Sequence, residues 1–204
     1  MSHFARRSTF IPIGIVLIAA ASACGSKADK SDSAAVADSA AAAMGAAQTP
    51  VAPALNDAQI AHIVVTANSI DSAAGVVAKA KGQNKLVKDF GQTMITDHGG
   101  VNAQAIALAT KLGVTPEDNA TSQQLSAGAA GSATTLQGLT ATSFDRAYVA
   151  REIAYHEAVL DALDKTLIPG AQNAELKELM VKVRPAFVAH LDHARELQKS
   201  IGTP

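Results

Sequence analysis

Apolar residues recur with a helical period through four long segments of this chain, and that period limits what the chain can fold into. Such a repeat lines one face of an α-helix with apolar side chains, which can be buried only against another element. Asn56 can cap the first segment, and Gly113 and Gly202 follow two others. No strand pattern of consequence occurs, so we predict an all-α fold. The predicted helices cover residues 57–81, 84–112, 142–167 and 173–201.

The connection between the second and third predicted helices, residues 114–141, is rich in Thr, Ser, Gly, Gln and Ala. It holds at most a short helix around residues 122–136. A connection this long can travel the length of a helical bundle, so that the next helix starts at the required end. We therefore predict a four-helix bundle with a short extra helix in a long crossover connection.

Three histidines and one aspartate lie among the apolar positions of these helices. Asp71 is on the apolar stripe of the first helix, and His98, His156 and His190 are on those of the other three. Bundles build metal sites from side chains that face one another across their core. Carboxylate and imidazole ligands suit a divalent transition metal ion, so the candidate cofactor is Zn, Cu, Fe or Mn.

Two further residues extend this candidate metal site. Glu152 lies one turn before His156, and His193 lies three residues after His190. Asp97 is about 100° around the helix from His98, and we expect it to cap the helix or pair with a lysine rather than point inward.

A second interpretation of the same residues stays open, because the Glu-x-x-His motif of metal-loaded bundles is absent. Each histidine could simply donate a hydrogen bond to a neighbouring carboxylate or carbonyl oxygen. Such a network would satisfy buried polar groups and fix the register of the helices.

The sequence predicts no catalytic residue. Its glycines form no phosphate-binding loop after a strand, and no serine sits in a nucleophile elbow. The single cysteine, Cys24, is predicted to be lipidated, which leaves no thiol nucleophile. These observations favour a binding or structural protein over an enzyme.

Residues 1–23 are typical of an export signal. Arg6 and Arg7 precede an apolar run that ends in small residues directly before Cys24, the position of the lipidated cysteine in bacterial lipoproteins. The alternative is a secreted protein cleaved after Ala23 that keeps a spare thiol. Gly25 rather than aspartate follows the cysteine, so we expect an outer-membrane lipoprotein that faces the periplasm.

Composition divides the rest of the chain and excludes one class of partner. Residues 24–54 are rich in Ala, Ser, Asp, Lys and Pro, which predicts a disordered tether, and residues 55–204 form a single domain. The net charge of −1, the absence of Trp and 3% aromatic residues argue against nucleic-acid binding.

The stretch from about Ile60 to Gly202 resembles the DUF4142 family of exported, often lipid-anchored bacterial proteins. The resemblance implies a ferritin-like helical bundle and brings no established activity. The residues that carry it are Val87 to Phe90, Met94 to His98, Leu139, Phe144 to Tyr148, Tyr155 with His156, and Pro185 with His190, Leu191 and Ala194.

Two functions therefore stay open for a chain held at the membrane by its lipid. In the first, the bundle binds or senses a metal ion through Asp71, His98, His156 and His190. In the second, the bundle is a non-catalytic structural, stress-protection or protein-interaction module that contacts an unidentified envelope protein and holds no metal.

Overall fold

The computed structural model describes residues 54–204, and every described residue in regular structure is helical. The predictions for the export signal, Cys24 and all but the last residue of the tether lie outside the described residues. The all-α prediction is confirmed. The elements are α1 (Asp57–Lys81), α2 (Lys85–Leu112), α3 (Ala120–Gly138), α4 (Ala141–Ala162), the π-helical turn η1 (Leu163–Leu167), α5 (Ile168–Gly170) and α6 (Ala174–Ile201).

Short-range capping sets where these helices begin and end. Asn56, Asn84, Asn119 and Asn173 each precede a helix, and each side-chain oxygen accepts a hydrogen bond from a backbone N–H of the first turn. Gly113 ends α2 in the left-handed conformation, with φ of 65°. The predicted starts of α1, α2 and α6 and the predicted end of α2 therefore have a local physical cause.

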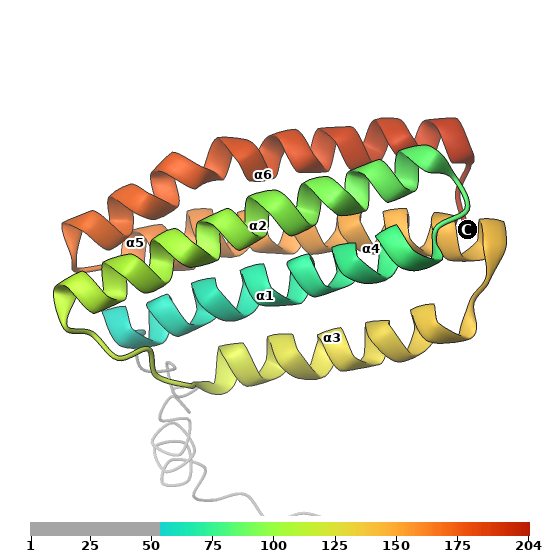
Figure 1. Ribbon diagram of the computed structural model, residues 1–204. Helices are drawn as coiled ribbons and strands as arrows, with labels where there is room; N and C mark the ends of the chain where they lie inside the picture. The colour runs from blue at the N-terminus through green and yellow to red at the C-terminus, as the bar shows by residue number, and fades with distance from the viewer. Residues whose placement is uncertain (1–53) are drawn as a thin grey trace, which may run out of the picture. The chain divides into compact units, whose positions relative to one another are not determined.

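The four long helices α1, α2, α4 and α6 pack into a closed ring (Figure 1). α1 and α2 form a hairpin, α4 and α6 form the second pair, and contacts between α2 and α6 and between α1 and α4 close the ring. α3 lies outside this ring along α1 and α4. It has 19 residues and is longer than the predicted helix over 122–136, yet only Ser122 and Leu136 in it are buried.

The α1 and α2 backbones touch where Gly75 faces Gly91. A Cβ atom added to Gly75 would lie 2.5 Å from the Gly91 carbonyl oxygen, and one added to Gly91 would lie 2.8 Å from the Gly75 carbonyl oxygen. Any larger side chain would push the helices apart, so this close approach requires glycine at both positions.

Two aspartates tie turns to helices that are distant in sequence. The Asp145 carboxylate accepts hydrogen bonds from the backbone N–H groups of Gln83 and Asn84, in the α1–α2 turn. The Asp57 carboxylate accepts equivalent bonds from Gln172 and Asn173, directly before α6. Each helix pair is thus anchored to the other by a carboxylate that satisfies otherwise free backbone donors.

The core inside the ring consists of two apolar clusters separated by a layer of buried polar residues. The first apolar cluster includes Ile60, Val159, Leu163, Met180 and Phe187. The second apolar cluster includes Val87, Phe90, Phe144, Tyr148 and Leu197. Along every long helix the polar residues lie between the members of these two clusters, and we call them the polar layer: Asn68, Asp71, His98, Glu152, His156 and His190.

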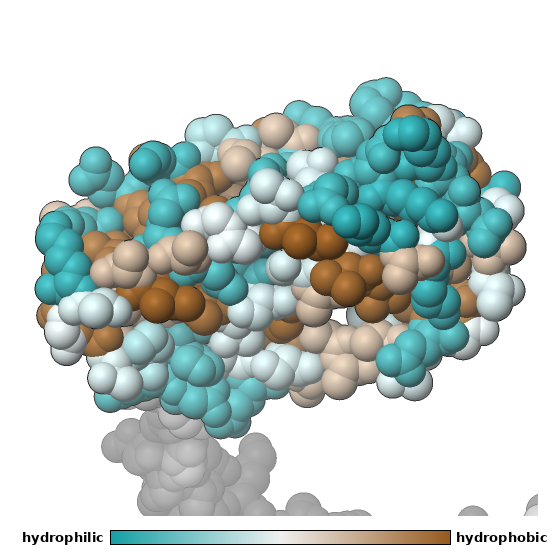
Figure 2. Space-filling view, in the orientation of Figure 1, coloured by the Kyte–Doolittle hydropathy of each residue, from teal (hydrophilic) through white to brown (hydrophobic). Residues whose placement is uncertain are grey.

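The face of the molecule shown in Figure 2 mixes polar and apolar residues. The large apolar side chains that are most exposed, Val76, Leu86, Ile106 and Val181, are distributed over α1, α2 and α6. By length and composition alone α1 could cross a membrane. Its buried residues, which include Ile60 and Asp71, instead face the other helices as part of the core.

Candidate metal centre

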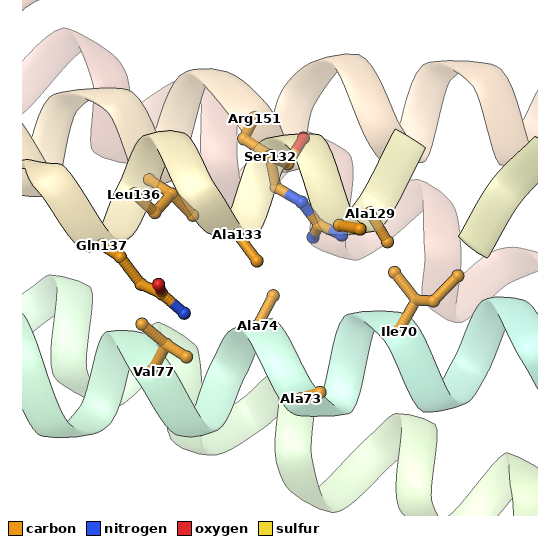
Figure 3. A pocket seen from close by; sticks show the side chains of 11 residues that line it. Ile70, Ala73, Ala74, Val77, Ala129, Ser132, Ala133, Leu136, Gln137 and Arg151 are labelled. Carbon is orange, nitrogen blue, oxygen red and sulfur yellow. The ribbon is translucent and has the colours of Figure 1, made fainter. Parts of the chain in front are cut away.

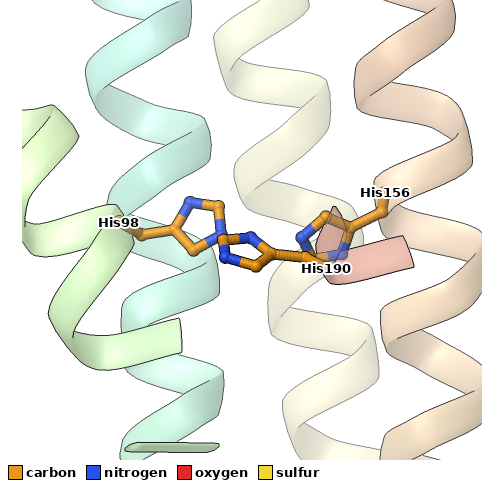
Figure 4. A group of neighbouring side chains, drawn as sticks. All are labelled: His98, His156 and His190. Carbon is orange, nitrogen blue, oxygen red and sulfur yellow. The ribbon is translucent and has the colours of Figure 1, made fainter. Parts of the chain in front are cut away.

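The polar layer joins one side chain or more from each long helix. Asp71 comes from α1, His98 from α2, Glu152 and His156 from α4, and His190 from α6. Asp71, Glu152 and His156 are 0% exposed, His98 is 1% exposed and His190 is 6% exposed. The three imidazole rings point toward one another across the core (Figure 4). Residues separated by more than 100 positions in the chain thus meet out of contact with water.

Short distances connect the donor atoms of this layer. His98, His156 and His190 each offer a ring nitrogen, and these three atoms lie within 4.8 Å of one another. The carboxylate oxygen Oδ2 of Asp71 lies 2.9 Å from His98 Nε2 and 3.5 Å from His156 Nε2. Four ligands around a tetrahedral Zn²⁺ ion, with bonds of about 2.0–2.1 Å, would be roughly 3.3 Å apart. The distances around Asp71 therefore bracket the separation that such an ion requires.

Each histidine uses one of its ring nitrogens to bind a group at the edge of the layer. His98 Nδ1 lies 2.8 Å from Asn68 Oδ1, while the Asn68 amide nitrogen donates to the Val64 carbonyl oxygen. His156 Nδ1 lies 2.9 Å from the backbone carbonyl oxygen of Glu152. Both partner atoms are acceptors, so each Nδ1 carries a proton and acts as the donor.

His190 follows the same rule with the opposite ring nitrogen. Its Nε2 lies 2.8 Å from Asp97 Oδ2 and donates to that carboxylate. Asp97 therefore pairs with a histidine, whereas the sequence suggested that it caps the helix or pairs with a lysine. His190 on α6 reaches across to the edge of α2. A histidine that binds a metal almost always donates its other N–H to a carboxylate or carbonyl group in this way.

The remaining ring nitrogens are left without hydrogen bonds in the centre of the layer. His98 Nε2, His156 Nε2 and His190 Nδ1 are fully buried and have no hydrogen-bond partner, and the same is true of Asp71 Oδ2. His98 Nε2 and Asp71 Oδ2 are close in space but not aligned for a hydrogen bond. A neutral imidazole whose outer nitrogen is protonated presents a lone pair here, as His156 and His190 do. A cation is one group that could pair with acceptor atoms in this position.

Burial and charge set the protonation states that this arrangement requires. Burial lowers the pKa of His156 to about 4 and also lowers the pKa of His190, so both rings are neutral at pH 7. Burial alone would raise the pKa of Asp71, but its interactions with His98 and His156 hold that pKa well below the usual range. Burial and the nearby Asp71 charge raise the pKa of Glu152. The layer thus offers the Asp71 carboxylate anion and the neutral imidazoles of His156 and His190, the forms in which these side chains bind metals.

Arg151 lies beside the layer and binds both of its carboxyl groups. Its Nη1 atom donates to Asp71 Oδ1 and to Glu152 Oε1, each at 2.6 Å. The guanidinium also stacks on the Tyr155 ring, 4.3 Å from its centroid, and the Tyr155 hydroxyl donates to the Ala67 carbonyl oxygen. These contacts fix Arg151 at the boundary between the polar layer and the space beneath α3.

That space is a cavity of about 280 Å³ between α1 and α3 (Figure 3). Small side chains line it, among them Ala74 on α1 and Ala133 on α3, and Arg151 reaches it from α4. The space-filling view shows an opening between the same two helices (Figure 2). The small side chains of α3 thus leave a route from solvent as far as the guanidinium group.

The structure brings together most of the candidate residues chosen from sequence. Asp71, His98, His156 and His190 share the polar layer, and Glu152 lies at its edge beside Arg151. His193 does not join them, because it is exposed on α6 and its ring contacts Phe90, with 5.0 Å between the centroids. His193 follows His190 by three residues, close to one helical turn, but its side chain is exposed and does not enter the polar layer.

Three participants were not identified from the sequence: Asn68, Asp97 and Arg151. Asn68 precedes Asp71 by three residues on the same buried face of α1, so helical spacing could have identified it. The role of Asp97 depends on His190 from another helix. Arg151 adjoins its partner Glu152 in the sequence, but its role also depends on Asp71 from α1, which no signal within α4 indicates.

The donor set indicates which ions could be held. Three imidazoles and one carboxylate favour first-row transition ions such as Zn²⁺, Cu²⁺ and Fe²⁺, whereas Mg²⁺ and Ca²⁺ prefer sites built of oxygen ligands. Mn²⁺ is less favoured because it prefers more oxygen ligands.

Comparison with known proteins gave one match. A search of curated proteins and a search of solved structures each returned no significant similarity. A family model described as "Domain of unknown function (DUF4142)" matches residues 39–197, which include the whole polar layer and the greater part of the chain. The chain belongs to the DUF4142 family.

Proposed function

We propose that this chain is a metal-binding lipoprotein of the bacterial cell envelope. In this proposal a ferritin-like four-helix bundle holds a divalent transition metal ion with Asp71, His98, His156 and His190. The lipidated Cys24 would anchor the protein in the outer membrane, facing the periplasm. We propose binding or sensing of the ion rather than catalysis, since the polar layer is wholly buried.

The observation that supports metal binding is a set of buried ligand atoms that have no hydrogen-bond partner. A purely structural network would pair its polar atoms with one another, because an unpaired buried polar atom costs roughly 1–3 kcal/mol. Here the outer nitrogen of each histidine is paired, whereas the inner nitrogens, Asp71 Oδ2 and Glu152 Oε2 have no hydrogen-bond partner. A metal ion bound in the layer would pair with inner atoms that have no other partner.

Elemental analysis tests this proposal. The full chain is purified without a metal-binding tag, in detergent where it is lipidated, incubated with Zn²⁺, Cu²⁺, Fe²⁺ or Mn²⁺, and desalted. We expect a retained transition metal ion in the wild type and in His193→Ala, and its loss in His98→Ala and His156→Ala. His193→Ala is the matched control because it removes an exposed histidine from the same helix as His190.

A folded wild-type protein that retains none of these ions would contradict the proposal. The polar layer would then be a structural network, and the function would move to protein interaction at the envelope. Circular dichroism of each variant distinguishes loss of ligands from loss of fold.

The proposed location has a separate test, because it depends on the sequence around Cys24 alone. We expect the wild type to sediment with outer membranes and Cys24→Ala to be released into the periplasmic fraction or left unprocessed. A Cys24→Ala chain distributed like the wild type would argue against the lipid anchor.

A further inference from the structure

The position of Arg151 carries an inference about how many ions the polar layer holds. It rests on the proposed metal binding. The layer contains two overlapping groups of donor atoms that share His156: one is His98, His156 and His190, and the other is Asp71, Glu152 and His156. Each group has donor atoms within 4.8 Å of one another, so by geometry each could hold an ion.

Arg151 already occupies the second group. Its Nη1 lies 2.6 Å from Asp71 Oδ1 and 2.6 Å from Glu152 Oε1, so a single nitrogen bridges the two carboxyl groups. A metal ion in this group would take one oxygen from each of the same two carboxylates, directly beside that nitrogen. The guanidinium therefore places a positive charge next to the position that a shared ion would take, and it leaves free one oxygen of each carboxyl group, Asp71 Oδ2 and Glu152 Oε2.

The charges in the layer lead to the same conclusion. An ion bound between Asp71 and Glu152 would require both carboxyl groups to be ionised, and these two groups together with Arg151 then carry one negative charge. One divalent ion changes this to one positive charge, whereas two ions beside Arg151 would leave three positive charges among groups that are 0–12% exposed. Uncompensated charge in a buried site is strongly unfavourable, so the layer with Arg151 in place accommodates one ion.

We propose that Arg151 takes the place of a second metal ion and restricts the chain to one divalent ion. Removing the guanidinium creates a second ion site between Asp71 and Glu152. Glu152 is equipped for this role, because its Oε2 atom is buried and has no hydrogen-bond partner.

The test is the number of Co²⁺ ions bound per full-length chain, measured by equilibrium dialysis and elemental analysis. We expect one ion in the wild type, one in Arg151→Lys, which keeps the positive charge, and two in Arg151→Gln. The control is Arg184→Gln, which removes an exposed arginine paired with Asp164 and should bind one ion. The double variant Arg151→Gln with Glu152→Gln loses a carboxylate together with the guanidinium and should return to one ion.

Two wild-type ions, or a single ion in folded Arg151→Gln, would overturn this inference and leave the proposed metal binding intact. A wild type that binds no Co²⁺ would instead overturn the proposed function. If metal-free Arg151→Gln does not fold, it is refolded with excess Co²⁺. Recovery of helical circular dichroism with two bound ions supports the inference, and failure to refold at any Co²⁺ concentration contradicts it.

Discussion

The two apolar clusters and the polar layer lie along the same four helices but use their buried side chains differently. In the apolar clusters, residues such as Phe90 and Phe144 are 0% exposed and need only neighbours of suitable shape. In the polar layer, residues such as His98 and Asp71 are as deeply buried, yet several of their atoms lack partners. The clusters can therefore stabilise the fold, whereas the layer imposes a cost that binding of an ion would offset.

The largest expected effect separates stability from binding. Phe90→Ala removes a fully buried ring that packs edge-on against Tyr148, with 6.3 Å between the centroids. We expect the free energy of unfolding to fall by about 3–5 kcal/mol in urea denaturation. Metal bound per folded chain should not change. A loss of metal in chains that are still folded would show that the second apolar cluster and the polar layer are not independent.

Acid should destabilise the polar layer through His156. In the unfolded chain this histidine takes up a proton near pH 6.5, whereas the pKa of about 4 in the folded protein keeps it neutral. The unfolded state then binds more protons between these values, so stability falls as the pH falls. Relative to His156→Gln, the metal-free wild type should lose about 3 kcal/mol of unfolding free energy between pH 7 and pH 4.

The quantity to measure is the difference in unfolding free energy between the wild type and His156→Gln at each pH. Glu152 has a raised pKa and stabilises the folded state as the pH falls, in the opposite sense to His156. Both proteins contain Glu152, so its contribution largely cancels. Parallel stability curves for the two proteins would show that His156 is not held neutral by burial.

An added ion should stabilise the layer in proportion to its occupancy. At a free Zn²⁺ concentration about 100 times the Kd, the unfolding free energy of the wild type should rise by about 2.7 kcal/mol. His193→Ala should respond equally, and His98→Ala should not respond. Thermal unfolding with and without Zn²⁺ measures this. Equal shifts in all three proteins would place the ion outside the polar layer.

The smallest expected effect lies outside both regions, at the α3–α4 junction. Ala141 has a φ of 52°, a conformation that costs alanine energy and glycine very little. Ala141→Gly should raise the free energy of unfolding by up to about 1 kcal/mol without changing metal content. A destabilised Ala141→Gly protein would indicate that chain entropy outweighs the local strain.

Sequence predicted the parts of the molecule that depend on local information. The long helices follow from the apolar period and from caps such as Asn56 and Gly113. The length of α3 was underestimated because it has almost no apolar stripe, although Asn119 and Ser122 form a capping box at its start.

The candidate site was predictable only for residues whose position on a helix face determines that the side chain is buried. His98 and His156 interrupt apolar stripes, and such side chains must point into the core. Arg151 also lies near that face and adjoins Glu152 in the sequence, but its contact with Asp71 is determined by the spacing between α1 and α4. The apolar period of a single helix carries no information about the spacing between two helices.

The contact between Gly75 and Gly91 also sets the height at which α1 and α2 present their ligands. From that contact, Asp71 lies four residues along α1, roughly 6 Å, and His98 lies seven residues along α2 in the same direction, roughly 10 Å. Side chains lean toward the start of their own helix, so the aspartate reaches away from the glycines and the imidazole reaches back toward them. The two side chains meet between these heights, which makes two glycines without functional groups the determinants of ligand alignment.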